Sequence, residues 1–274
     1  MILALKRSVL IWPALILLIA FYLVPSLDVM RSSLFDPDFT TQHFDRIFGR
    51  PVYMTMFWRT VMVSLVVALV GALIAWPVAY YINAQPRRKQ FLLIFLVFVP
   101  MWMSVLIRSY AWLVALGREG VVNAALMGLG LSSDPIQLLY TPASVQFAML
   151  QILLPIQIVT TYGAMTEIDF DLMRAARILG ASKWQALRRV FVPLSFDGAI
   201  SGMIVAFMLS MGFFITPALL GGPRQRMLGN MIETQVAQLN WGFAAGLGML
   251  LLVGTLCFVI VLKLAGRLVL RALK

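Results

Sequence analysis

Six long apolar stretches divide this sequence, and they restrict the chain to one class of fold. They cover residues 8–27, 60–86, 90–107 with a continuation past Arg108, 135–166, 198–223 and 234–262. A helix of roughly 20 apolar residues crosses a bilayer core about 30 Å thick, so each stretch can hold one membrane-spanning helix. Backbone groups in lipid must be paired within the segment, and continuous runs favour helices over the alternating strands of a barrel. We therefore predict an all-α integral membrane protein with six transmembrane helices.

The composition excludes several other classes of protein. Charged residues make up 12% of the chain, whereas a soluble domain carries roughly 25%. Cys257 is the only cysteine and His43 the only histidine, which excludes a disulfide framework and most metal or histidine-dependent catalytic sites. The net charge of +11 could indicate nucleic-acid binding, but the basic residues flank the apolar stretches instead of forming a solvated stripe. We predict a membrane protein that is not itself an enzyme and binds neither metal nor nucleic acid.

The basic residues also predict the orientation of the chain. Fourteen of the 22 fall on one side of the predicted membrane: Lys6, Arg7, Arg87, Arg88, Lys89, Arg174, Arg177, Lys183, Arg188, Arg189, Lys263, Arg267, Arg271 and Lys274. Because lysine and arginine accumulate in cytoplasmic loops, we predict that both termini are cytoplasmic. No small-residue cleavage site follows the first stretch, so we expect it to be a retained helix and not a signal peptide.

The longest predicted cytoplasmic loop, residues 167–193, begins with a short amphipathic helix. Asp169 or Asp171 can cap the start of this helix. Gly180 stands where a helix ends in a residue that tolerates positive φ. The apolar side is predicted to comprise Leu172, Ala175, Ala176 and Leu179.

A second short helix is predicted in the same loop. Ser182 can cap it, and Trp184, Leu187 and Phe191 then fall on one face. Pro193 is expected to stop this helix or to bend it into the fifth span. Two interpretations remain open on the pattern alone. The loop is either a connector that lies on the membrane with its basic residues facing anionic lipid, or a rigid element that docks a soluble partner.

The spacing within this loop resembles a known motif. Arg174-Ala175-Ala176 is followed by three residues, Gly180, nine residues and Val190-x-Val192-Pro193. This resembles the EAA loop (Glu-Ala-Ala, three residues, Gly, nine residues, Ile-x-Leu-Pro) of permease subunits in type I, binding-protein-dependent ABC importers. In that family the loop docks into a groove of the ATPase subunit and transmits nucleotide-driven motion. The resemblance assigns to this coupling loop Asp171, Arg174, Ala175, Ala176, Gly180, Trp184 and Pro193.

One position departs from the family pattern. Arg174 stands where the family has its leading glutamate, and a reversed charge at a docking site leaves an opposed charge unpaired unless the partner changes too. We expect either that the ATPase of this system carries an acidic residue at the contact, or that Glu167, Asp169 and Asp171 supply the negative charge one or two turns earlier.

Three further segments resemble the spermidine/putrescine branch of these permeases. They are VPMWMSVLIRSYAW (99–112), YTPASV (140–145) and GNMIETQVAQLNWGFAA (229–245). The resemblance implies one permease domain over residues 1–274 in a bacterial inner membrane. It also implies two copies of an ABC ATPase, a second similar permease and an extracytoplasmic solute-binding protein as partners. The chain has no G-x-x-x-x-G-K-[ST] phosphate loop, so ATP and Mg²⁺ are expected on the ATPase and no cofactor on this chain.

Candidate pathway residues follow from the chemistry of a polyamine, whose ammonium groups favour aromatic faces. Trp102 and Tyr110 lie in or beside the third stretch, and Gln146 and Gln157 share a helical face in the fourth. Each has an ordinary alternative as an interfacial anchor or a packing residue. Another small amine or organic solute is the alternative substrate. A stand-alone channel or secondary transporter usually needs charges within its spans, and these spans have almost none.

Overall fold

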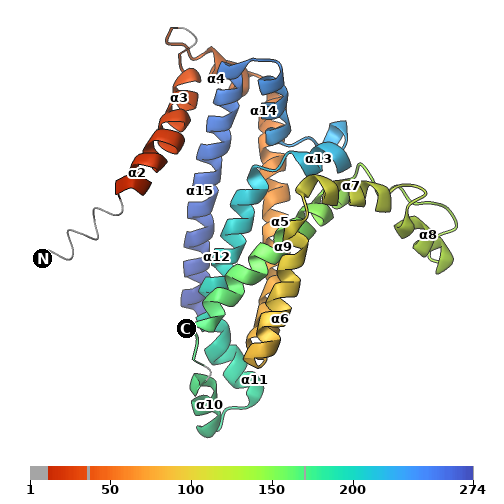
Figure 1. The fold of residues 1–274 in the computed structure, drawn as a ribbon, viewed down its shortest axis with the longest axis vertical. Coiled ribbons are helices and arrows are strands. Elements are labelled where there is room, and N and C mark those ends of the chain that lie inside the picture. Colours follow the sequence, from red (N-terminus) through yellow and green to blue (C-terminus); the bar gives the residue numbers. More distant parts are fainter. Residues whose placement is uncertain (1–11, 36–37, 170, 274) are drawn as a thin grey trace, which may run out of the picture. The chain divides into compact units, whose positions relative to one another are not determined.

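Helices make up nearly all of the described chain (Figure 1). The computed structural model describes residues 12–35, 38–169 and 171–273, and no strand is assigned within them. The prediction of an all-α protein is confirmed. The start of the first apolar stretch and the terminal residues Lys6, Arg7 and Lys274 lie outside the described residues, and the cytoplasmic location of the termini stays a prediction.

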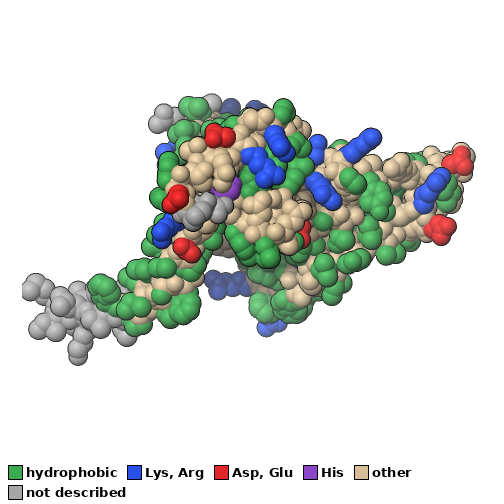
Figure 2. Space-filling view, turned by 90° about the horizontal axis from the view of Figure 1, so that it is seen from above, with side chains coloured by type: hydrophobic (Ala, Val, Ile, Leu, Met, Phe, Trp, Pro, Cys, Tyr) green, Lys and Arg blue, Asp and Glu red, His purple; other side chains and the backbone are tan. Residues whose placement is uncertain are grey.

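Five helices are long and apolar enough to cross a membrane, and a sixth span is counted if one sharply bent pair crosses as a unit. The five are Trp12–Ser32, Pro51–Asn83, Pro142–Thr166, Lys183–Met211 and Trp241–Leu270, and the bent pair is Arg87–Trp102 with Val105–Ala115. Each overlaps one predicted stretch, and the predicted six spans are reached when the bent pair is counted as one span. Large apolar side chains are exposed along these spans. Such a surface is suited to lipid. Figure 2, which views the molecule from above, shows hydrophobic groups together with scattered basic and acidic groups on that face.

Two compact units make up the fold, and the first comprises Met1–Thr55 with Met231–Leu252. It contains α2 (Trp12–Leu18), η1 (Ile19–Leu23), α3 (Val24–Ser32), α4 (Gln42–Gly49) and the first part of α15 (Trp241–Leu273). The guanidinium of Arg46 lies 4.1 Å from the ring centroid of Phe243, and the His43 ring lies 6.2 Å from the same centroid. The single histidine of the chain is therefore a buried packing residue of α4.

The second unit comprises Met56–Asn230 with Val253–Lys274. Its helices are α5 (Pro51–Asn83, which begins in the first unit), α6 (Arg87–Phe98), η2 (Val99–Trp102), α7 (Val105–Ala115), α8 (Val121–Gly128), α9 (Pro142–Thr166), α10 (Asp171–Ile178), α11 (Lys183–Ala186), η3 (Leu187–Phe191), α12 (Val192–Met211), α13 (Ile215–Leu220), η4 (Pro223–Gln225), the start of α14 (Leu228–Ala237) and the rest of α15. The interpretation of residues 1–274 as a single permease domain stays a prediction.

Small residues bring α9 and α12 into close contact. Gly198, Gly202, Ala206 and Ser210 recur every fourth residue of α12, and all four are buried. A Cβ atom at Gly198 would lie 2.5 Å from the Cβ of Ala164, and one at Gly202 would lie 2.9 Å from Thr161 Oγ1. Helices in lipid gain little from burying apolar surface, so they associate through such small-residue contacts.

A buried glutamine joins α9 to α5. Gln157 Nε2 donates to the carbonyl oxygen of Ala68 at 3.0 Å. Gly71, one turn further along α5, has no side chain, and a Cβ there would collide with the Gln157 amide. This hydrogen bond pairs the buried Nε2 group, while Gln157 Oε1 has no partner among the described residues. α9 is thereby held against α5 on one side and α12 on the other.

The third predicted span is broken, which corrects the expectation of a single run through Arg108. The axes of Arg87–Trp102 and Val105–Ala115 differ by 85°, and Figure 1 shows α6 and α7 pointing in different directions. Pro100 lacks the N–H that would continue the helix, and Ser104 caps the next one by accepting from Leu106 N–H at 3.3 Å. Arg108 is buried on α7, and its Nε and Nη1 have no partner within the described chain.

The fifth span starts earlier than predicted. The apolar stretch begins at residue 198, but the span runs over Lys183–Met211 and includes Pro193. Of the two expectations for Pro193, the one that it stops the second loop helix is wrong, and the helix instead continues into the fifth span. The π-helical turn η3 ends two residues before the proline, with Val192 N–H bonded to Leu187 O. Because this wider turn shifts the hydrogen-bond register by one residue, it accommodates a residue that cannot donate.

Candidate functional site

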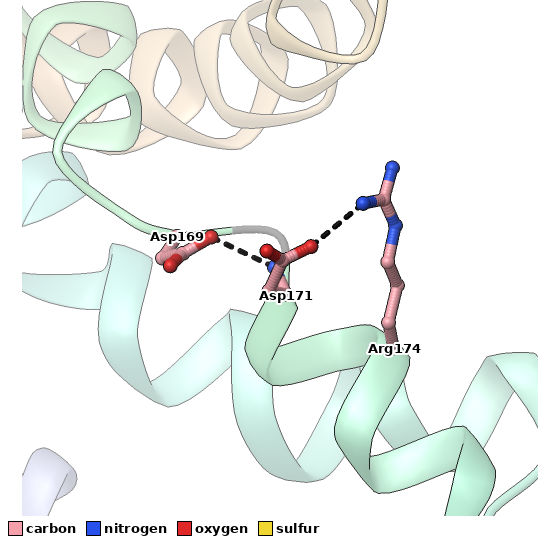
Figure 3. Close-up of polar contacts among 3 residues, drawn as sticks. All are labelled: Asp169, Asp171 and Arg174. Atoms are coloured by element: carbon pink, nitrogen blue, oxygen red, sulfur yellow. Dashed lines mark hydrogen bonds and ion pairs between the residues drawn. The ribbon is translucent and has the colours of Figure 1, made fainter.

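The helix α10 begins and ends as its sequence predicts. Asp169 Oδ1 accepts a hydrogen bond from the backbone N–H of Asp171 at 2.9 Å, as Figure 3 shows. Gly180 follows the helix with φ +93°, and Ala181 N–H bonds back to Ala176 O at 3.0 Å. This six-to-one bond is that of a Schellman motif, which requires the left-handed conformation at the glycine. The loop therefore forms a defined elbow.

Arg174 forms an ion pair within α10. Its Nη1 lies 2.7 Å from Asp171 Oδ1, one turn earlier on the same side of the helix (Figure 3). Both side chains are exposed, so the pair contributes little to stability, about 0–1 kcal/mol. Its consequence is local: the reversed charge at the position of the family glutamate already has a carboxylate beside it. Whether Asp171 or an acidic residue of the ATPase supplies the negative charge at the contact stays a prediction.

The second loop helix begins with a capping box. Ser182 Oγ accepts from Gln185 N–H, and Gln185 Oε1 accepts from Ser182 N–H. The predicted common face of Trp184, Leu187 and Phe191 is buried only toward its end. Phe191 is fully buried, with its ring 5.0 Å from that of Tyr80, whereas Trp184 is 67% exposed. The helix enters the core of the unit only as it becomes the fifth span.

The two sides of α10 have different surroundings. Leu172, Ala175 and Leu179 lie on one side and are exposed, Leu179 to 88%. With 100° between successive residues, Met173, Arg174 and Arg177 lie on the opposite side. These three line a cavity of about 680 Å³. Exposed apolar faces of this kind are typical of sites that contact another protein or a membrane.

Residues from three segments line this open cavity. Tyr80 and Asn83 come from the end of α5, Arg174 and Arg177 from α10, and Lys183 and Trp184 from α11. The α5 residues were not predicted to belong to this site, because they precede the loop by about 90 residues and no local pattern links them. Asn83 Nδ2 donates to Met165 O at 3.0 Å, which fixes the end of α5 against the end of α9.

The four candidate pathway residues have different environments. Trp102 ends η2 at the break in the third span, is 73% exposed, and packs edge-on to Phe95 at 5.7 Å. Tyr110 is half exposed on α7. Gln146 is partly buried on α9. Gln157 is buried and donates through Nε2 to α5, while its Oε1 has no hydrogen-bond partner among the described residues. The assignment of these residues to a pathway stays a prediction.

The fold and the loop together define a membrane-embedded permease subunit of an ABC importer. Residues 2–271 match the family described as the binding-protein-dependent transport system inner membrane component, and the chain belongs to this family. It is an inner-membrane protein without catalytic activity of its own, and it works with a separate ATPase subunit and a solute-binding protein.

Similar proteins include two spermidine/putrescine transport system permease proteins PotB. The one from Haemophilus influenzae is 33% identical over 253 residues, 88% of each chain. The one from Escherichia coli K12 is 31% identical over 237 residues, 83% of this chain and 86% of that one. Among solved structures, a bacterial ABC transporter involved in the import of the acidic polysaccharide alginate has a TM-score of 0.75 at 20% identity, covering 96% of this chain and 97% of that one. That likeness supports the fold.

Proposed function

We propose that this chain is one of two paired permease subunits of a polyamine importer that transports spermidine or putrescine. The observation that carries the proposal is the 31–33% identity to the two PotB permeases over more than four fifths of this chain. Two copies of an ABC ATPase bind ATP and Mg²⁺ and drive the pair, and this chain binds no cofactor. An extracytoplasmic binding protein delivers the solute.

The candidate coupling loop, residues 167–193, is the ATPase contact in this proposal. Its support is the exposed apolar face of α10 formed by Leu172, Ala175 and Leu179, which a groove in a soluble subunit can cover. The Gly180 elbow and the capping box at Ser182 hold α10 and α11 at a defined angle. Because Lys183 begins the fifth span directly, a displacement of the loop is passed to a membrane helix without an intervening flexible segment.

Cation recognition along the pathway is assigned to exposed aromatic faces. Trp102 lies at the break in the third span and Tyr110 lies in the middle of α7, and both are exposed in this chain. An ammonium group over a tryptophan or tyrosine face gains about 0.5–2 kcal/mol. Gln146, partly buried on α9, offers an amide oxygen. Gln157 is held between α9 and α5, and we assign it to positioning the helices.

The test is uptake of radiolabelled spermidine and putrescine. A bacterial strain without polyamine importers would express this chain with the ATPase, permease and binding-protein genes next to its own. Uptake that needs all four components and is blocked by unlabelled polyamine is the expected result. If the four components transport another amine and not polyamines, the substrate assignment is wrong. Uptake by this chain alone, without ATP, would indicate a channel or secondary transporter.

A further inference from the structure

We propose that the cavity between the end of α5 and the elbow α10–α11 binds the phosphate headgroup of an anionic phospholipid. This site is separate from the solute pathway and does not depend on which solute is transported. It would make the position of the coupling loop sensitive to the lipid around it.

The charge of the cavity favours a phosphate group. Arg174, Arg177 and Lys183 line it, and no carboxylate belongs to its lining. Asp171 neutralises Arg174, while Arg177 and Lys183 have no ion pair within the described residues. Two cations facing one cavity without a counter-ion repel each other, and a phosphate between them removes that repulsion.

The other walls suit the rest of a lipid headgroup region. Tyr80 and Trp184 contribute amphipathic rings, and Met173 and Leu187 contribute apolar surface. Trp184 is largely exposed although it is the bulkiest side chain of the loop. Tryptophan and tyrosine prefer the depth at which lipid headgroups lie. A volume of about 680 Å³ accommodates a headgroup rather than a single ion.

The location of the cavity distinguishes a lipid from other phosphate compounds. It lies between the end of one span, Pro51–Asn83, and the start of another, Lys183–Met211. Both ends are on the predicted cytoplasmic side, and Arg87, Arg88 and Lys89 follow the first of them. Basic pockets between transmembrane helices at the cytoplasmic side bind anionic lipid headgroups.

The lipid site and the apolar part of the proposed ATPase contact use different sides of α10, and Arg174 belongs to both. Met173, Arg174 and Arg177 line the cavity, while the exposed face of Leu172, Ala175 and Leu179 lies about half a turn away. A lipid can therefore remain bound while a soluble subunit covers the apolar face. A carboxylate of the partner is the competing occupant of the cavity.

The experiment titrates cardiolipin and phosphatidylglycerol onto the purified, delipidated full-length chain, with native mass spectrometry as the readout. The test variant is R177Q/K183Q. The matched control is R188Q/R189Q, which removes two exposed charges of the same stretch that do not line the cavity. At roughly a fivefold effect for each removed charge, the test variant should bind about 25-fold more weakly. The control should stay within about twofold of the native chain, and phosphatidylcholine should not compete.

Three results would overturn the proposal. Equal losses in the two double variants would mean unspecific attraction by the basic surface. Displacement of cardiolipin by millimolar inorganic phosphate would mean a site for a soluble phosphate. Release of the lipid when the ATPase binds would mean that the partner occupies the cavity. Circular dichroism of each variant excludes misfolding as the cause. None of these outcomes affects polyamine uptake, so this proposal and the functional one fail separately.

Discussion

The α9–α12 contact and the candidate coupling loop are neighbours in the sequence, but the first is closely packed and the second is not. Along α12, Gly198 and Gly202 let the backbone approach α9 until even a methyl group would collide. In the loop, Gly180 has nothing within 4 Å of where its Cβ would stand. The first pair of glycines serves packing, whereas Gly180 serves backbone conformation at a turn.

This difference shows that the spans of the chain supply its rigidity, whereas the loop supplies a surface for contact with a partner. The spans gain stability from close backbone approach, because lipid offers them no other driving force. The loop has few internal contacts and is shaped by local hydrogen bonds at its caps. It therefore leaves one face of α10 uncovered for a soluble partner, and its residues can change with less loss of stability than those of the spans.

The largest expected effect is a loss of stability at the packed contact between α9 and α12. Gly198→Val inserts a branched side chain where Ala164 Cβ would lie 2.5 Å from the new Cβ. Overpacking of this kind costs about 1–3 kcal/mol or more, so we expect most of the protein to be lost from the monodisperse fraction after extraction in detergent. Gly163→Val on α9, where nothing lies within 4 Å, is the control and should behave like the native chain. Equal losses from the two variants would show that the close contact between Gly198 and Ala164 does not limit the stability of the protein.

The next effect concerns coupling and leaves the fold intact. Arg174→Glu places a carboxylate beside Asp171, its present ion-pair partner, and reverses the charge that the ATPase meets. Because like charges across an interface oppose association, we expect ATP-driven uptake to fall by about tenfold with an unchanged amount of protein in the membrane. Arg188→Glu, also exposed, is the control for net charge. Unchanged or improved uptake with Arg174→Glu would exclude a role for the reversed charge.

A smaller effect is expected from the apolar face of α10. Leu179 is 88% exposed, so Leu179→Ala should not alter folding. If this face is the ATPase contact, removal of one apolar anchor costs about 1 kcal/mol or more of binding, and co-purification of the ATPase should fall about fivefold. Leu264→Ala, an exposed leucine of α15, should leave co-purification unchanged. Equal recovery of the ATPase with both variants would move the contact elsewhere.

The smallest effect is at the cap of the second loop helix. Ser182→Ala removes one half of the capping box, at about 1 kcal/mol. Backbone amides of residues 183–186 should exchange with deuterium about fivefold faster, while the spans keep their protection. Ser201→Ala, whose hydroxyl bonds to Asp197 O within α12, is the control and should not change exchange in the loop. Unchanged exchange in Ser182→Ala would mean that tertiary contacts, and not the cap, hold α11.

Local features were predictable wherever neighbouring residues decide them. The start of α10 beside Asp169, the turn at Gly180 and the cap at Ser182 follow from hydrogen bonds within a few residues. The small-residue repeat from Gly198 to Ser210 was not predicted, because the sequence does not say which face of the helix packs against α9. The break at Pro100 and Ser104 was missed because apolar periodicity continues across it.

The sequence by itself determined the class of this protein: length and continuity of apolar stretches require membrane helices, because backbone groups in lipid must pair within their segment. It also determined the caps and the turn of the loop. Only the tertiary structure decided that Pro193 lies within a span, that Gln157 joins α9 to α5, and that Tyr80 and Asn83 meet Arg177 and Lys183 at one cavity. These outcomes depend on which helices lie side by side, and contacts between distant segments leave no mark on local spacing.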